Sequence, residues 1–264
     1  MRSRCLCLVA IILLVACGPA SNPPDVTLTV FAAASLTDAF NDLGGAFETD
    51  HSAVEVVFNF AGSNQLAQQI AQGAPVDVFA SANQAQMTAA IDTGRITAGA
   101  QQVFARNRLV LIFPASNPAN LATLNDLAVP GLKLVLAAAE VPVGQYSLDF
   151  LDKASADLTF GAGFKDSVLA NVVSYEENVR AVYTKVSLGE ADAGIVYTSD
   201  IMGEGSNAVG RLDIPDELNT IAAYPIAALN DALHAEAAQV FVDFVLSEAG
   251  QATLARNGFV PAVP

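Results

Sequence analysis

The sequence passes four times from a short apolar strand pattern, through a few small residues, into a helical pattern. In the first junction, VFAAASLTDAF at residues 30–40, β-branched and aromatic residues lead through three alanines to Ser35, and apolar residues then recur at helical spacing. The other junctions are FNFAGSNQLAQQI (58–70), KLVLAAAEVPVGQYSLDF (133–150) and YEENVRAVYTKV (175–186). Strands that alternate with helices in this way predict an α/β fold with mainly parallel sheets covered on both faces.

Each junction places a helix N-terminus directly after a strand. The first N–H groups of a helix have no backbone acceptor and carry the positive end of the helix dipole, so they favour anions. Ligands of open α/β sheets lie outside the carboxyl ends of the strands, where such helices begin. Ser35, with Asp38 three residues later, is expected to be the N-cap of its own helix. One such junction would indicate only a capped helix, but two in each half of the chain predict two lobes that enclose one small anion.

The residues at the junctions would supply hydrogen-bond donors rather than charge. Their side chains are short, apolar or hydroxylated, which leaves backbone N–H groups and hydroxyls to face a ligand: Ala33, Ala34, Ser35, Gly62, Ser63, Val143, Val179 and Tyr197. Arg180 is the one cation directly next to any of these residues. Because it follows an inward-facing Val179 by one position in a helix, its side chain is expected to point away from the ligand.

The first seventeen residues form an export signal. Arg2 and Arg4 precede an apolar stretch at 6–15 that is too short to span a bilayer as a helix. The sequence LVACG at 14–18 resembles a bacterial lipobox, in which Cys17 would be lipid-modified and become the new N-terminus. The alternative is an ordinary signal peptide with a chance cysteine. A polar, Pro-rich and Ser-rich tether is expected at 18–26.

Composition excludes several classes of function. All three cysteines, Cys5, Cys7 and Cys17, lie in the signal region, so no disulfide or thiol nucleophile is expected after it. The two histidines and the carboxylates show no metal-site spacing. A formal net charge of -15 makes nucleic acids and anionic lipids poor partners. A small anion is still compatible with this charge, because local dipoles can hold it in a buried site.

The order of patterns along the chain predicts two lobes. Strands are expected at 54–60, 76–80, 108–113, 133–138, 172–174, 194–197 and 221–229. The first crossing between lobes is expected between Phe104 and Arg108. The last strand contains Pro225 and is therefore expected at a sheet edge or at the second crossing. Lobe 1 would comprise 27–106 and 223–264, and lobe 2 would comprise 107–222.

Six runs, in this order, resemble the periplasmic molybdate-binding proteins of molybdate ABC importers over nearly the whole mature chain: VFAAASLTDAF, FNFAGSNQLAQQI, GAPVDVFASAN, EVPVGQY, ENVRAVYTKVSLGEADAGIVYTSD and FVDFVLSEAGQATLARNGF. The resemblance implies a type II periplasmic-binding-protein fold: two α/β lobes, each a mostly parallel sheet flanked by helices, with a tetrahedral oxyanion in the cleft between them. It also implies which groups hold the oxyanion: the hydroxyls and N–H groups of Ser35 and Ser63, the N–H groups of Val143 and Val179, and the hydroxyl of Tyr197. These groups would contact the oxygens that surround the metal atom.

Two positions depart from the family pattern. Val143 stands where the family usually has alanine, which keeps the N–H group but could tighten or tilt the pocket. Asn83 stands where aspartate is common and is expected to be structural.

A site built only of donors predicts selection by protonation. Molybdate, tungstate and sulfate offer acceptors alone, whereas phosphate near neutral pH keeps a proton that would need a buried acceptor. Phosphate is therefore expected to be rejected. Sulfate would be distinguished by its shorter bonds and hence by cavity size, and tungstate is nearly isosteric with molybdate.

The expected function is that of a non-enzymatic, lipid-anchored, extracytoplasmic receptor without a cofactor. It would be a monomer that closes on molybdate or tungstate and delivers it to the permease of an ABC importer. An alternative is a binding protein for sulfate or another tetrahedral oxyanion. A Ser-dependent hydrolase would need a base near Ser35 or Ser63, and the sequence has no G-x-S-x-G motif. The ligand-sensing half of a transcription factor would need a DNA-binding domain, and none is expected before Leu28.

Overall fold

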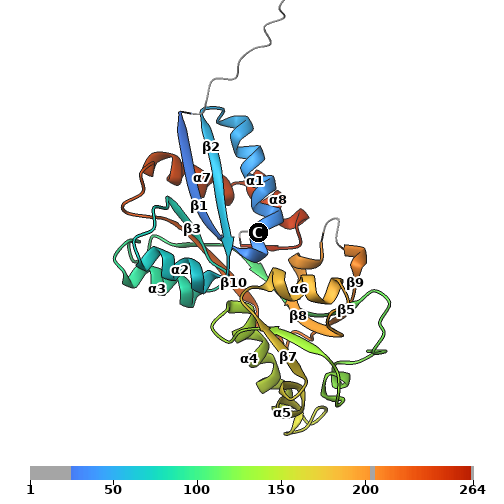
Figure 1. The fold of residues 1–264 in the computed structure, drawn as a ribbon. Coiled ribbons are helices and arrows are strands. Elements are labelled where there is room, and N and C mark those ends of the chain that lie inside the picture. The colour runs from blue at the N-terminus through green and yellow to red at the C-terminus, as the bar shows by residue number, and fades with distance from the viewer. Residues whose placement is uncertain (1–24, 203–205, 263–264) are drawn as a thin grey trace, which may run out of the picture.

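The computed structural model describes residues 25–202 and 206–262, which form two sheets flanked by helices (Figure 1). The predicted signal segment, Cys17 and nearly all of the tether lie outside the described residues. Among the described residues, every helix is too short or too polar to cross a membrane. The predicted α/β fold with two lobes is confirmed by this arrangement.

The first sheet has the strand order β11-β4-β10-β3-β1-β2. Its strands are β1 (Val26–Ala33), β2 (Val54–Ala61), β3 (Val78–Ala80), β4 (Gln102–Asn107), β10 (Ala222–Ala228) and β11 (Val260–Pro261). β1 pairs in parallel with β2 and β3, while β10 is antiparallel to β3 and β4 and β11 is antiparallel to β4. The four strands β1 to β4 therefore run in one direction, and β10 and β11 run in the other.

Helices cover both faces of the first sheet, and the side chains of β1 are buried on each face. Leu28 and Val30 pack in a core with α1 (Thr37–Asp50) and α7 (Ala235–Leu246). Phe31 points to the opposite face, where it packs with α2 (Ser63–Ala71) and α3 (Gln84–Asp92). The helix α8 (Glu248–Arg256) follows α7 and contacts α1.

The second sheet has the order β7-β6-β8-β5-β9. Its strands are β5 (Leu109–Pro114), β6 (Leu134–Ala137), β7 (Val172–Glu176), β8 (Ala193–Tyr197) and β9 (Val209–Asp213). β6 is parallel to β7 and β8, and β5 is antiparallel to β8 and β9. The helices are α4 (Pro142–Ala156), α5 (Phe164–Leu169) and α6 (Val179–Ser187). Short 3-10 turns lie at Ala34–Leu36, Leu124–Ala128, Thr198–Ile201 and Ser206–Ala208.

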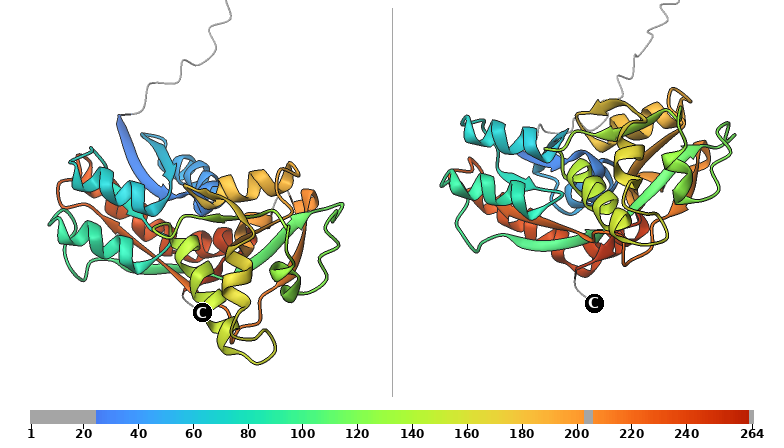
Figure 2. Two further views of the ribbon diagram at one scale, coloured as in Figure 1. Left: turned by 60° about the horizontal axis from the view of Figure 1, so that its bottom comes forward. Right: turned by 90° about the horizontal axis from the view of Figure 1, so that it is seen from below.

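The chain changes sheets twice, between β4 and β5 and again between β9 and β10. The strands of the first sheet thus come from 26–107 and 222–261, and those of the second from 109–213. Figure 2 shows the two groups of elements side by side, with the N-terminal and C-terminal segments in the same group. The lobe boundaries given above stay a prediction.

Of the two places expected for the proline-bearing strand, the structure shows the second. β10 follows the second crossing, but it lies inside the sheet between β3 and β4 rather than at an edge. The register with β4 shifts between Tyr224 and Pro225. A proline lacks the N–H that a regular ladder requires, and an irregularity of this kind is where an interior strand tolerates it.

An aromatic cluster fixes α1 on the first sheet. The rings of Phe40, Phe47 and Phe241 are fully buried. The centre of the Phe241 ring lies 6.2 Å from that of Phe40 and 5.2 Å from that of Phe47. Burying a phenylalanine contributes about 1.5–3 kcal/mol. This packing holds the first turn of α1 at the end of β1.

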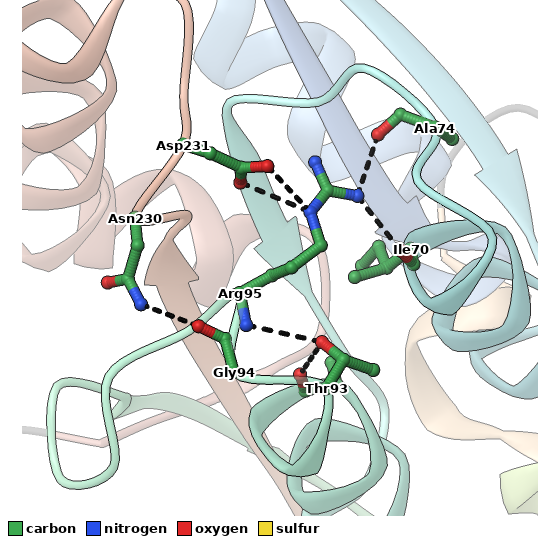
Figure 3. A network of polar contacts seen from close by, with 8 residues as sticks. Ile70, Ala74, Thr93, Gly94, Arg95, Asn230 and Asp231 are labelled. Carbon is green, nitrogen blue, oxygen red and sulfur yellow. Dashed lines mark hydrogen bonds and ion pairs between the residues drawn. The ribbon is translucent and has the colours of Figure 1, made fainter.

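A polar network around Arg95 ties together segments that are distant in sequence (Figure 3). Its guanidinium donates to both carboxylate oxygens of Asp231, at 3.1 and 2.9 Å, and to the carbonyls of Ile70 and Ala74, both at 2.9 Å. A cation is favourable at the Ile70 carbonyl because it lies in the last turn of α2, where the helix dipole is negative. The network therefore anchors α2 from its C-terminal end and leaves its N-terminus facing the second sheet.

Candidate functional site

One cavity lies where the predicted junctions from both sheets meet. It is lined by the ends of β1, β2 and β8 and by the starts of α2, α4 and α6: Ala33, Ala34, Ser35, Ala61, Gly62, Ser63, Ala82, Val141, Pro142, Val143, Asn178, Val179 and Tyr197. All five residues predicted to bind the ligand are therefore brought to one place. Cys17 lies outside the described residues.

The first junction differs from the expected helix start. A 3-10 turn over Ala34–Leu36 precedes α1, which begins at Thr37, and neither segment has a side-chain cap. The prediction that Ser35 caps its helix is wrong, because the additional turn places Ser35 inside a turn rather than before a helix. Its hydroxyl instead lies 2.9 Å from the hydroxyl of Tyr224.

The second junction brings the two sheets close together. Gly62 is the N-cap of α2 and Ser63 is its first residue. A Cβ on Gly62 would lie 2.7 Å from the carbonyl oxygen of Glu177, which precedes Asn178, the N-cap of α6. Only glycine permits this approach of backbone to backbone. The Ser63 hydroxyl oxygen accepts a hydrogen bond of 3.0 Å from the N–H of Ala82.

The third and fourth junctions present backbone N–H groups at helix positions without an internal acceptor. Val143 is the second residue of α4, after Pro142, and Val179 is the first residue of α6. The first N–H groups of a helix have no backbone partner within it. Asn178 caps α6 by accepting from the N–H of Ala181 at 3.0 Å, so its side chain is committed to a donor further along the helix.

Gly144 determines how closely α4 approaches its strand. A Cβ at this position would lie 2.0 Å from the carbonyl oxygen of Ala138 and 2.5 Å from that of Ala137. Neither backbone group could move without displacing the end of β6. The glycine thus keeps the Val143 N–H at the rim of the sheet.

Tyr197 contributes a buried hydroxyl that lacks a partner within the described part of the chain. The residue ends β8 and is 1% exposed, and its oxygen makes no hydrogen bond there. Burial raises the pKa of Tyr197 well above its usual value of 10, so the hydroxyl keeps its proton at neutral pH. A buried polar group without a partner is destabilising by about 1–3 kcal/mol, so this hydroxyl is available to donate to an acceptor that enters the cavity.

The cavity contains no ionised side chain among its lining residues. Arg180, as expected, does not face it: its guanidinium makes two hydrogen bonds to Asp38 on α1, at 3.0 and 2.9 Å. This ion pair joins a helix of the first sheet to a helix of the second. The positive potential of the cavity comes from the starts of α2, α4 and α6, each of which carries a partial positive charge.

The cavity is small. Its volume is about 20 Å³, compared with about 10–15 Å³, by a similar measure, for a single water. A sugar, a peptide or a nucleotide would not fit, and an ion of a few heavy atoms would.

One residue at the site was not predicted from the sequence. Tyr224 lies on β10, far from the junctions, and reaches Ser35 from behind the cavity. The available signal was a lone polar aromatic residue in the small-residue strand IAAYPIAAL. Asn83 has the structural role that was expected, since it caps α3 by accepting from the N–H of Gln86 at 2.9 Å.

Comparison with known proteins gives a family and two kinds of relative. Residues 28–260 match the model of a bacterial extracellular solute-binding protein family. The molybdate-binding protein ModA of Mycobacterium tuberculosis is 38% identical over 93% of this chain and 92% of its own length. A putative ABC transporter substrate-binding lipoprotein of Bacillus subtilis, YvgL, is 29% identical over 96% of this chain and 95% of its own length.

Two solved structures share the fold. A periplasmic molybdate-binding protein from Azotobacter vinelandii has a TM-score of 0.77 and 19% identity, over 88% of this chain and 98% of its own. The sulfate-binding protein SubI of Mycobacterium tuberculosis has a TM-score of 0.79 and 18% identity, over 90% of this chain and 88% of its own. At these identities the likeness concerns the fold alone.

Proposed function

Because the chain belongs to the bacterial extracellular solute-binding proteins, and among them to the molybdate-binding proteins, we propose that it captures molybdate, and equally tungstate, for an ABC importer. The ligand would be held by the hydroxyls of Ser35, Ser63 and Tyr197 and by backbone N–H groups that include those of Val143 and Val179.

The observation that carries this proposal is the state of the three hydroxyls. The oxygen of Ser63 accepts a bond from a backbone N–H, and that of Ser35 lies against another hydroxyl. The Tyr197 hydroxyl makes no hydrogen bond within the described residues. A ligand made of acceptors alone would satisfy donors of this kind, and a tetrahedral oxyanion is small enough for the cavity.

Hydrogen-bond donors in place of charges would favour a fully deprotonated anion. Hydrogen phosphate carries a proton that would meet only other donors, and such a mismatch in a buried site is destabilising by about 1–3 kcal/mol. Phosphate should therefore bind poorly.

Sulfate is the second candidate ligand. It has the same shape and protonation state as molybdate, and a sulfate-binding protein has the same fold with a TM-score of 0.79. The greater identity to molybdate-binding relatives favours molybdate. The larger side chain of Val143, compared with the alanine usual in the family, is the first position to examine if sulfate proves the better ligand.

The remainder of the proposal concerns where the protein works. We infer that residues 1–17 are an export signal, that Cys17 carries a lipid anchor, and that the monomer delivers its anion to a membrane permease. The similarity to a putative substrate-binding lipoprotein supports the anchor. We propose no enzymatic activity: within the described part of the chain, no histidine or carboxylate lines the cavity beside Ser35 or Ser63, and activating a serine nucleophile requires such a base.

Isothermal titration of the purified protein, dialysed free of anions, tests the proposal. Molybdate and tungstate should bind tightly at one site, sulfate more weakly, and phosphate hardly at all. If sulfate bound best, the molybdate assignment would be replaced by sulfate. If phosphate bound best, the donor-only explanation of the site would be wrong.

A further inference from the structure

Tyr224 and Ser35 share a hydrogen bond whose direction determines what Ser35 offers to a ligand. Their hydroxyl oxygens lie 2.9 Å apart, and either could donate. If Ser35 donates to Tyr224, its oxygen is left to accept from the ligand. If Tyr224 donates, the hydrogen of Ser35 is left for the cavity. Both residues are buried, Tyr224 completely, so bulk water does not compete for this hydrogen bond.

Asn107 fixes the direction. Its Oδ1 accepts from the backbone N–H of Arg108 at 3.0 Å, and an amide oxygen is the only end of the side chain that can do so. The same oxygen accepts from the hydroxyl of Thr198 at 2.9 Å. The amide nitrogen therefore lies on the other side, where it donates to the Ser199 hydroxyl at 2.8 Å and faces the Tyr224 hydroxyl at 3.5 Å.

The oxygen of Tyr224 thus meets an N–H donor on one side and Ser35 on the other. Within the described residues, Ser35 is the one acceptor that makes a hydrogen bond with the Tyr224 hydroxyl. The neighbouring hydroxyl of Tyr197, whose pKa is raised by burial and by Tyr224, makes no hydrogen bond there. Burial raises the pKa of Tyr224 far above its usual value, so its proton is present at neutral pH. The chain of bonds therefore runs from Asn107 to Tyr224 to Ser35 and ends with the hydrogen of Ser35.

We propose that Asn107 and Tyr224 are specificity-determining residues: they commit Ser35 to donating into the cavity, so that an anion carrying a proton is refused. This inference rests on the proposed function, since it explains how the same cavity would distinguish molybdate from hydrogen phosphate. Neither residue lines the cavity, so both act on the ligand through Ser35.

The hydroxyl of Ser63 is also committed to donating into the cavity, but by a backbone group that a substitution cannot remove. Its oxygen accepts from the backbone N–H of Ala82, a group that only donates, so its own hydrogen is also left for the cavity. At Ser35 the equivalent role is performed by side chains. The direction of that bond can therefore be reversed.

Asn107→Asp reverses it with little change in shape. One carboxylate oxygen keeps the bonds to Arg108 and Thr198, and the other, in place of the amide nitrogen, accepts from Tyr224. Tyr224 can then accept from Ser35, and the Ser35 oxygen can accept from a protonated ligand. The control is the double variant Asn107→Asp with Tyr224→Phe, which carries the same added charge but has no hydroxyl to connect position 107 to Ser35.

The measurement is the ratio of the dissociation constants of phosphate and molybdate, by isothermal titration at pH 8, for the wild type and the three variants. A negative charge near the site weakens both dianions, so the ratio isolates the effect of the proton. Asn107→Asp should lower the ratio by about tenfold or more, the effect of matching one buried hydrogen bond. Tyr224→Phe alone frees Ser35 to accept as well as to donate, so it should lower the ratio by less than Asn107→Asp does. The double variant should give the ratio of Tyr224→Phe, because position 107 is then no longer connected to Ser35.

Three results would overturn the inference: an unchanged ratio in Asn107→Asp, a double variant whose ratio equals that of Asn107→Asp rather than that of Tyr224→Phe, or an unchanged ratio in Tyr224→Phe. The last applies even if Asn107→Asp lacks a cooperative thermal transition and does not fold. A wild-type protein that binds neither molybdate, tungstate nor sulfate would instead refute the proposed function itself. The two failures are therefore distinguishable.

Discussion

Replacing Tyr197 by phenylalanine should weaken ligand binding without weakening the fold. The variant removes one oxygen that is buried and makes no hydrogen bond among the described residues. In the bound state this hydroxyl would donate to an anion, and hydrogen bonds to charged groups contribute about 1.5–3 kcal/mol. At about 1.4 kcal/mol for each factor of ten, the dissociation constant of molybdate should rise roughly 10- to 150-fold.

The unliganded protein should respond in the opposite sense. No intramolecular hydrogen bond is lost, and the burial of an unsatisfied hydroxyl is relieved, so the unliganded variant should melt at the same temperature as the wild type or higher. At the same concentration of molybdate, the melting temperature of the variant should rise less than that of the wild type, because stabilisation by a ligand depends on the affinity of the ligand. Titration calorimetry and thermal denaturation with and without molybdate measure both effects.

The matched control is Tyr175→Phe. Tyr175 is 57% exposed on β7, a strand at the edge of the second sheet, and does not line the cavity. This variant should change neither affinity nor stability. The reasoning would be refuted if Tyr197→Phe bound molybdate like the wild type, or if it lowered the melting temperature of the unliganded protein, since the hydroxyl would then serve the fold.

Three further predictions concern the remaining groups. Ser35→Ala and Ser63→Ala should each weaken molybdate binding by about 1–3 kcal/mol in titration calorimetry; unchanged binding in both would remove them from the site. Asp38→Asn breaks the ion pair with Arg180, which joins helices of the two sheets; because the pair is partly exposed, affinity should fall by no more than about fivefold at low salt, and by less at about 1 M salt. An equal loss at both salt concentrations would contradict this. Burial raises the pKa of Asp200 to about 7 from 3.8. Between about pH 4 and 7 the folded state keeps a proton that the unfolded chain has lost, so stability falls as pH rises. The unfolding free energy of the wild type minus that of Asp200→Asn should therefore decrease across this range and level off above it; a difference independent of pH would show that Asp200 titrates normally.

The junctions could be predicted because their signals are local. The change from a strand pattern to a helical one, with small residues between, lies within a dozen residues in each case, and topology then brings the four helix starts together. The role of Ser35 could not be predicted in the same way. Its partner, Tyr224, is 189 residues away, and the turn that holds Ser35 inside the cavity wall has no sequence pattern that distinguishes it from a capped helix.

Elements with weak local patterns were missed. β4 (QVFARN) and β9 (VGRLD) carry charged residues that interrupt the alternation expected of strands, and α5 has only six residues. Each is stabilised by its neighbours rather than by its own propensity: β9 pairs along its whole length with β5. For β10 the sequence left two places open, a sheet edge and the second crossing. The structure shows the crossing, where an irregular register with β4 lets an interior strand hold a proline.

The absence of ionised side chains from the lining of the cavity explains how a protein of net charge -15 could select one anion among several. A lysine or arginine in the cavity would attract every oxyanion, because a point charge does not depend on where the protons of the ligand lie. Arg180, which directly follows Val179, is instead engaged by Asp38. Backbone N–H groups and hydroxyls of fixed direction provide less attraction, but each requires an acceptor at a defined position. A hydrogen phosphate ion fails this requirement at one oxygen, and a molybdate ion meets it at all four, so the direction of each bond determines which anion is retained.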